Sequence, residues 1–156
     1  MLNPSQLADQ LERQWLTDEN GPHPDSVPAS ADVFAGVVSQ WFMTAQAAGI
    51  PVVTAMPRRP MLMALATPAL MAQAPAAAGQ QLANAIMLYM TGQMYGAGVA
   101  APPVATGAAG SMIGNAFATL DLDRGSRAQI IGTAVHIMAL TTIVSFPHPP
   151  FAAPVS

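Results

Sequence analysis

Few side chains in this sequence have the chemistry to bind a metal or move a proton, and the three histidines come first. His23 lies in an acidic, Pro-containing connector and His148 in a Pro-rich tail, so both are interpreted as solvated loop residues rather than metal ligands. His136 lies within an apolar stretch and has no carboxylate within one helical turn. That setting favours a hydrogen-bonded histidine at a packing interface over a catalytic base. The histidines therefore predict no acid–base site.

The segment Asp121-Leu122-Asp123-Arg124-Gly125 has the D-x-D-x-G beginning of a calcium-binding loop, in which alternate oxygens converge on the cation. The pattern then fails, because the twelfth position should be a bidentate glutamate and is Gly132. We interpret the segment as an interhelical turn whose acids lie near the start of the last helix, where the helix dipole favours negative charge. A cation held by Asp121 and Asp123 is the alternative.

Methionines are dense in the middle of the chain, and thioethers can bind Cu(I). Without cysteine or paired histidine, however, adaptable packing explains these residues better. They are Met56, Met61, Met63, Met71, Met87, Met90 and Met94. The sequence has no G-x-S-x-G elbow, phosphate-binding loop or dinucleotide fingerprint. We therefore predict a protein that is not an enzyme, with no catalytic residue, metal, cofactor or small-molecule substrate.

The charge distribution is the most informative feature of the composition. No Asp, Glu, Lys or Arg occurs between Pro60 and Leu120, the chain has no lysine, and only 8% of its 156 residues are charged. A soluble domain normally carries about a quarter of its residues as charges. The apolar surface is therefore expected to be covered by neighbouring subunits or by lipid. Since there is no basic stripe, nucleic-acid binding is not expected.

The elements that must carry these residues are predicted to be short helices, because the chain is rich in Ala, Met, Val and Leu and holds 15 prolines and 12 glycines. Asn3 as N-cap, Pro4 at the first helical position and the spacing of Leu7, Leu11 and Trp15 predict a first amphipathic helix. An acidic connector over 17–30 follows. The further predicted helices cover 30–48, 60–66, 75–91, 108–120 and 126–140, with Ser126 as N-cap of the last.

Two connections remain open to alternatives. Pro68 either ends the helix over 60–66 or begins another short one that stops before Pro75. The loop 92–110, with five glycines and two prolines, is long enough to make functional contacts.

The C-terminal part is predicted to be extended. The β-branched segment 141–146 favours the chain's one strand over a continuation of the last helix. Four prolines in the segment 147–156 forbid a helix, so the tail is expected to lie along another surface through Phe151 and Val155. The fold class is mainly α: a bundle of five to six short helices in a single domain, divided as 1–29, 30–146 and 147–156.

Two stretches, 33–56 and 128–146, approach the length of a membrane span, but Gly49-Ile50-Pro51 breaks the first and neither has Lys and Arg flanks. Burial in an assembly of like subunits fits better, because interface cores are depleted of charge. Arg58 and Arg59 are expected to pair with the acidic N-terminal segment of the same or a neighbouring subunit. The candidate interface residues are Trp41, Phe42, Arg58, Arg59, Tyr89, Tyr95, Phe146, Phe151 and Val155.

The order of these features resembles small structural proteins of tailed bacteriophages over about residues 30 to 150. The resemblance consists of an acidic N-terminal helix, an Ala-rich helix ending in Tyr89-Met90-Thr91-Gly92, a Gly/Ala/Pro loop and a last helix passing into the Thr/Val run at 141–144. It implies a repeated virion component of the tail or baseplate, with neck and capsid positions left open, and with no catalytic residues to carry over.

The hypothesis from sequence is thus a non-enzymatic, homo-oligomeric subunit that packs against other virion proteins in a particle assembled in the host cytoplasm. The alternative is a small membrane-inserted helical protein of the pore or holin type.

Overall fold

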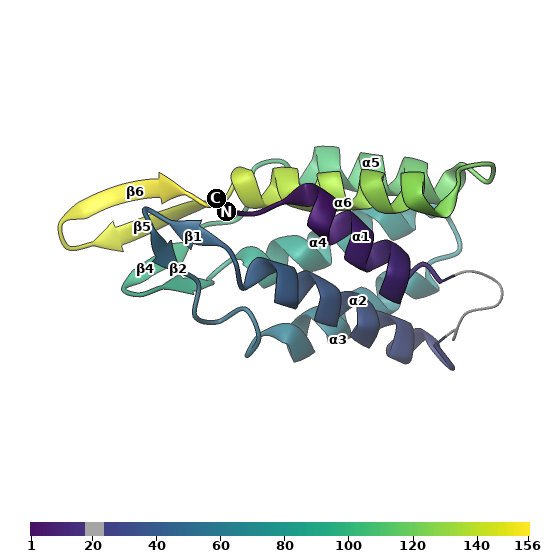
Figure 1. The fold of residues 1–156 in the computed structure, drawn as a ribbon, viewed down its shortest axis with the longest axis horizontal. Helices are drawn as coiled ribbons and strands as arrows, with labels where there is room; N and C mark the ends of the chain where they lie inside the picture. Colours follow the sequence, from purple (N-terminus) through teal and green to yellow (C-terminus); the bar gives the residue numbers. More distant parts are fainter. Residues whose placement is uncertain (18–23) are drawn as a thin grey trace.

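The structure is a computed structural model that describes residues 1–17 and 24–156. It is mainly helical, as predicted, but short strands gather at one end of the helical bundle (Figure 1). The helices of the described residues are α1 (Pro4–Gln14), α2 (Val27–Phe42), α3 (Arg59–Met71), α4 (Pro75–Met90), α5 (Thr106–Ala118) and α6 (Arg124–Leu140). The strands are β1 (Gln46–Ala47), β2 (Ile50–Pro51), β3 (Met94–Tyr95), β4 (Gly98–Ala100), β5 (Ile143–Pro147) and β6 (Pro150–Pro154).

Helix α1 forms as its sequence predicts. The Asn3 side chain accepts a hydrogen bond from the Ser5 N–H at 2.9 Å, which satisfies one of the free donors at the helix start. Leu7 and Leu11 are fully buried, and Trp15 follows them into the core at the C-terminal end of the helix. The four-residue apolar spacing therefore docks α1 on the bundle.

Helix α2 begins earlier and ends earlier than the predicted 30–48. Its N-cap is Ser26, whose hydroxyl accepts from the Ala29 N–H at 3.2 Å, and Pro28 lies in the first turn, where its missing N–H costs nothing. Ser30 instead accepts a hydrogen bond from the Trp15 indole at 3.0 Å. After Phe42 the chain turns into the β1–β2 hairpin, with Ala48 and Gly49 at positive φ. The connector thus ends before residue 27, and the part that holds His23 lies outside the described residues.

Helix α3 runs through Pro68, so neither alternative for that proline is correct. Proline removes the hydrogen bond to the carbonyl of Ala64 four residues earlier. Both Ala64 and Pro68 are exposed, so that carbonyl faces water and the helix continues to Met71.

Helices α4 and α5 are in backbone contact. A Cβ built on Gly79 would lie 2.2 Å from the Gly114 nitrogen and 2.6 Å from the Gly110 carbonyl oxygen. Only glycine at position 79 allows this approach, which brings the Ala-rich face of α4 directly onto α5. The predicted helix 75–91 is confirmed as α4, and Gly92 follows with φ of 76°.

Helix α6 starts at Arg124, two residues before the predicted Ser126. Its N-cap is Asp123, whose carboxylate accepts hydrogen bonds from the Ser126 N–H at 2.9 Å and the Ser126 hydroxyl at 2.5 Å. These bonds hold the pKa of Asp123 below its usual value, with the Ser126 hydroxyl as the main cause. The predicted N-cap, Ser126, is therefore wrong, and Asp123 takes that place. Its position agrees with the interpretation of this segment as a turn whose acids lie near the helix start.

The C-terminal segment 141–146 does contain a strand, β5, but it is not the chain's one strand. Strands β3, β4, β5 and β6 form an antiparallel sheet in that order. The Pro-rich tail is extended, and it pairs with β5 of its own chain from Ile143↔Pro154 to Pro147↔Pro150. Prolines at the ends of β6 permit this pairing because the residues between them supply the N–H groups.

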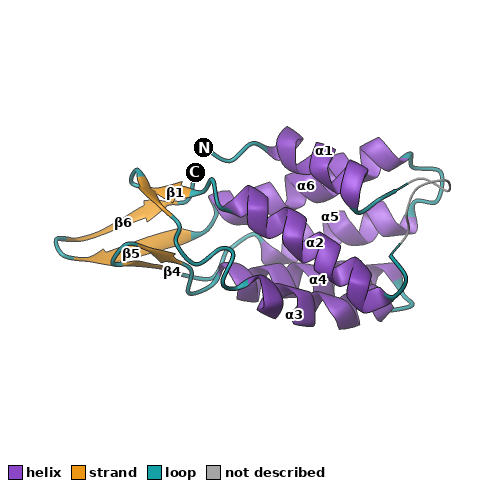
Figure 2. Cartoon of the chain, turned by 60° about the horizontal axis from the view of Figure 1, so that its bottom comes forward, coloured by secondary structure: helices purple, strands orange, loops and turns teal. Residues whose placement is uncertain are grey.

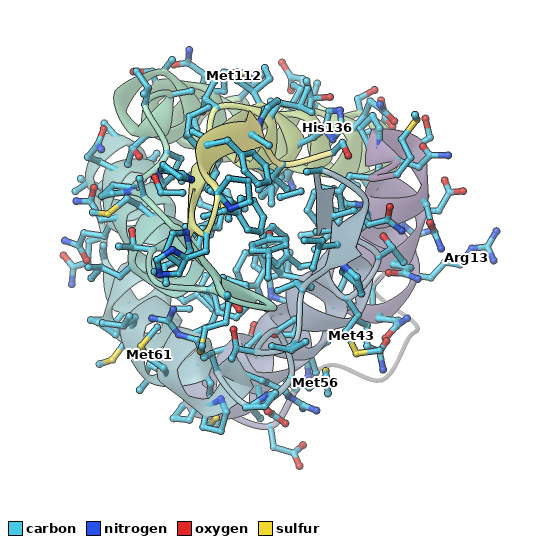
Figure 3. All side chains as sticks on the ribbon, turned by 90° about the vertical axis from the view of Figure 1, so that its left-hand side faces the viewer. Arg13, Met43, Met56, Met61, Met112 and His136 are labelled. Atoms are coloured by element: carbon cyan, nitrogen blue, oxygen red, sulfur yellow. The ribbon has the colours of Figure 1, made fainter. Side chains whose placement is uncertain are left out.

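The strands close into a ring. Gln46 and Ser156 exchange N–H···O bonds of 3.0 and 2.8 Å, which joins β1 to the end of the β6 segment. On the other side the Val53 N–H donates to the Met94 carbonyl at 2.9 Å, which joins β2 to β3. Figure 3 looks at the molecule from the strand end, and Figure 2 shows that both termini lie where the strands meet the helices. Helices and sheet share one continuous hydrophobic core, from Leu2 to Val155.

Candidate contact surface at the sheet end

Four of the predicted interface residues lie in the chain's own core. Trp41, Phe42, Tyr89 and Tyr95 are at most 1% exposed. The Trp41 indole donates to the Asn3 carbonyl at 2.8 Å, and the rings of Phe42 and Tyr89 meet edge to face with centroids 5.8 Å apart. In this fold these side chains have no surface to present to another subunit; they hold the bundle together.

Two buried tyrosines lie where the bundle meets the sheet. The Tyr89 hydroxyl donates to the Ala55 carbonyl at 3.0 Å, and burial raises its pKa to about 12. Burial also raises the pKa of Tyr95, and neighbouring Tyr89 adds to the effect. The Tyr95 hydroxyl has no hydrogen-bond partner among the described residues. Both phenols are therefore protonated and serve the core rather than proton transfer.

The two isolated arginines have internal partners. The Arg59 guanidinium lies 2.7 Å from a carboxylate oxygen of Asp32, one of the N-terminal acids, in the same chain. Arg58 donates to the carbonyls of Thr91 and, at 3.2 Å, Leu88, at the C-terminal end of α4. A cation there complements the negative end of the helix dipole. Arg127 does the same for α5, through the carbonyls of Ala116 and Thr119, each at 3.1 Å.

The sheet end carries no charged side chain. The segments 43–57, 91–105 and 141–156, which hold all six strands, contain no Asp, Glu, Lys or Arg. Within residues 1–17 and 24–156, every charged side chain belongs to a helix or to a connection or turn at a helix end. The two ends of the molecule therefore differ in electrostatics as well as in backbone structure (Figure 2).

The inner face of the sheet is buried and its outer face is exposed and apolar. Val144 on β5 is fully buried, and its strand alternates exposed and buried along its whole length. Met94 pairs with Val99, and Val99 with Ser145, so these side chains share the outer face. Met94, Val99 and Ile143 are 40 to 48% exposed. Sequence analysis missed these three residues; the alternation within 143–147 is the signal that could have found the last.

The β5–β6 hairpin projects furthest from the bundle (Figure 1). The rings of Phe146 and Phe151 are stacked, with centroids 4.5 Å apart and planes 9° from parallel. A Cβ built on Gly98 would lie 2.5 Å from the Phe146 ring, so glycine there lets Phe146 lie flat on β4. Phe146 is 6% exposed, whereas Phe151 is 43% exposed and Val155 only 1%. Of the predicted tail contacts, only Phe151 is exposed, and it lies on the same face of the hairpin as Phe146.

Prolines protect the free edge of β6. The Val155 N–H bonds the Thr142 carbonyl of β5, while Ser156 bonds Gln46 on the opposite side. Because neighbouring residues of a strand bond to opposite sides, Pro150, Ala152 and Pro154 face the outer edge. Two of these three have no N–H, which is how edge strands avoid adding a further strand. A partner is therefore expected at the face or tip of the hairpin, not at its edge.

A hollow lies in the bundle, on the side away from the strands. Its volume is about 220 Å³, and it is lined by Leu70, Ala72, Gln73 and Pro75 of the α3–α4 connection, with Ala78 and Phe117. Gln73 supplies the one polar side chain of this set. The hollow belongs to the uncharged segment between residues 60 and 120.

The residues considered for chemistry do not converge. His136 lies 6.1 Å from the Trp41 ring between their centroids, at a packing interface as predicted, but its Nδ1 has no hydrogen-bond partner among the described residues. Burial lowers its pKa. Among the methionines considered for Cu(I), Met71 ends α3 beside the α3–α4 connection, whereas Met94 lies on β3 in the sheet, so the set cannot share one ion. Within residues 1–17 and 24–156, no group of three or more His, Cys, Asp or Glu could hold a metal.

None of the helices in the described part of the chain has both the length and the apolar character needed to cross a membrane. No protein-family model, curated protein or solved structure matches this chain.

Proposed function

We propose that the protein is a non-enzymatic structural subunit that joins a larger assembly through its sheet end. The observation that carries the proposal is the outer face of the sheet, where Met94, Val99 and Ile143 are exposed and no charged residue is present. Exposed, contiguous apolar surface of this kind is typical of protein–protein contacts. The setting we propose, on the resemblance in sequence order, is a bacteriophage virion, at the tail or baseplate, built from many copies and their neighbours.

The lack of charged side chains on the sheet supports a partner whose contact surface is also uncharged. The five arginines and the acids of the described residues lie outside the strands, and several are engaged within the bundle. An uncharged face can be buried without the large cost of removing a charge from water. The face therefore fits further copies of this chain or similarly uncharged virion proteins.

A pair of matched substitutions tests this proposal. Val99 on the sheet is 48% exposed and Leu88 on α4 is 44% exposed, so both tolerate a polar side chain in the isolated subunit. Val99→Glu is expected to abolish self-association measured by sedimentation velocity, because the carboxylate would have to be buried unpaired. Leu88→Glu is expected to leave association unchanged. A wild-type protein that stays monomeric at every concentration, and joins no particle when expressed with neighbouring virion proteins, would sink the proposal.

A further inference from the structure

We propose that the tip of the β5–β6 hairpin of one copy inserts Phe151 into the hollow at the α3–α4 connection of the next copy, so that subunits join head to tail. This inference rests on the proposed function, since it names the receptor for the projecting part of the sheet end. The two surfaces face away from each other along the long axis of the molecule: the hairpin lies at the strand end, and the α3–α4 connection at the far end of the bundle (Figures 1 and 2).

Size is the first argument for this occupant. Phe151 is 43% exposed at the projecting end, and the ring of Phe146 stacks against one of its faces. The hollow measures about 220 Å³. An apolar cavity of about 150 Å³ is enough to hold a benzene molecule, so a phenyl ring fits with room for part of the adjoining backbone.

Chemistry is the second argument. The hairpin tip, residues 146–151, has no formal charge, and the hollow is lined by Leu70, Pro75 and Phe117 with no charge either. The outward carbonyls of Pro150 and Ala152 have no strand beside them, and Gln73 is an amide donor in the lining. One hydrogen bond from Gln73 to such a carbonyl would satisfy a polar group that the apolar contact removes from water.

Symmetry is the third argument. The projecting Phe151 (the knob) and the hollow lie on different parts of one chain, so their contact is heterologous. Such a contact produces a ring if the rotation from one subunit to the next closes on itself, and a filament if it does not. A stable interface covers about 800 Å² on each partner. The tip is too small to supply that area alone, so it acts as the anchor, while the outer face of the sheet and the helix ends around the hollow supply the remainder.

The test uses two variants that remove opposite halves of the contact. Phe151→Ser removes the projecting ring, and Ala72→Trp places a large side chain in the hollow from a half-buried position in extended backbone just after α3. Each variant alone is expected to associate at least tenfold more weakly than wild type, because buried aromatic anchors carry most of an interface's affinity. Mixed in equal amounts, they are expected to form a one-to-one dimer and nothing larger, since one retains the hollow and the other the knob.

Controls separate this inference from loss of folding and from the proposed function. Val104→Ser and Leu88→Trp alter residues that are 85% and 44% exposed and lie outside the strands and away from the hollow, so they should leave association unchanged. His148→Glu, at the exposed tip, places a charge beside Phe151 without removing the ring stack and should weaken association as Phe151→Ser does. Circular dichroism checks that each variant keeps its helix content.

Three results would overturn the inference. Wild-type assembly that persists in both single variants would place the contact elsewhere and leave the proposed function standing. Homodimers of each single variant would show a two-fold contact through one face. Mixed variants that remain monomeric while wild type assembles would show that the knob and the hollow do not meet. A wild type that never assembles would instead remove the proposed function itself.

Discussion

The helical bundle and the sheet end are both poor in charge, but they differ in where their apolar side chains lie. In the bundle the apolar side chains are mostly buried in the chain's own core. Glycines bring α4 and α5 into backbone contact, and arginines donate hydrogen bonds to carbonyls at helix ends. At the sheet end the inner face joins the core, but the outer face leaves Met94, Val99 and Ile143 exposed. The difference shows that the scarcity of charge in the sequence has two causes, dense internal packing in one region and an uncovered surface in the other.

The largest expected effect is a loss of stability in the helical bundle, caused by separating α4 from α5. Gly79→Ala places a Cβ 2.2 Å from the Gly114 nitrogen, and neither backbone can move without separating α4 from α5. We expect the free energy of unfolding to fall by about 3 kcal/mol, as for severe overpacking. Gly107→Ala is the matched control, because nothing lies within 4 Å of its added Cβ. Urea denaturation of both proteins makes the comparison, and equal stabilities would contradict the close approach.

A smaller loss is expected at the C-terminal end of α4. Arg58→Met removes the guanidinium that serves the carbonyls of Thr91 and Leu88. Since hydrogen bonds to a charged group contribute about 1.5 to 3 kcal/mol and this side chain is partly exposed, we expect a loss of about 1.5 kcal/mol. Arg13→Met, at an exposed position on α1, should change stability by less than about 0.5 kcal/mol. Thermal unfolding monitored by circular dichroism distinguishes the two variants. Equal losses of stability would contradict the stabilising role of Arg58 at the end of α4.

At the sheet end, a substitution on the edge of β6 is expected to change aggregation while leaving stability almost unchanged. Replacing Pro150 and Pro154 together with Thr restores two N–H groups on the outer edge of β6. We expect unfolding free energy to change by less than about 1 kcal/mol, while slow aggregation at high concentration increases, because an open edge accepts a further strand. Light scattering over time measures this, with Pro68→Thr on the exposed side of α3 as control. Identical scattering would mean that the edge is protected by other means.

The smallest expected effect concerns pH. The pKa of His136 is lowered by burial, so the unfolded chain binds a proton there more readily than the folded chain. Its contribution to stability is therefore intact above the unfolded pKa of about 6.5 and declines as pH falls through the folded pKa. We expect wild type to lose slightly more stability between pH 7 and pH 5 than His136→Gln does. Parallel pH dependences in the two proteins would exclude this contribution.

Sequence reasoning predicted the helices best where a cap and a period agreed. Asn3 with Pro4 marks α1, and Pro75 with Gly92 encloses α4. The start of α2 was missed because Ser26 and Pro28 lie in a Pro-rich acidic segment that has no apolar period. At Pro68 the rule that proline ends a helix failed, since solvent can satisfy the freed carbonyl.

The strands and the contact surface were much harder to predict, for a physical reason. Strands β1 to β4 have two or three residues each, which is too short for alternation to appear. Large aromatic residues were chosen as interface candidates. A large apolar side chain, however, is buried in the chain's own core as readily as between chains, and Trp41 and Tyr89 are buried in the core. The alternation along β5 separates its two sides, but which side is buried depends on the core beneath the sheet and on β4, which comes from a distant part of the sequence.

The closed ring of strands has a consequence for the order of folding. It joins residues near 46 to 53, 94 to 100 and 143 to 156, which are separated along the chain by α3 and α4 and by α5 and α6. Contacts between distant segments form slowly, because the entropy of closing long loops is lost before the contacts are gained. The outer face of the sheet is then among the last surfaces to take shape as a chain matures. A subunit would present it only when complete, which would keep unfinished chains from joining an assembly too early.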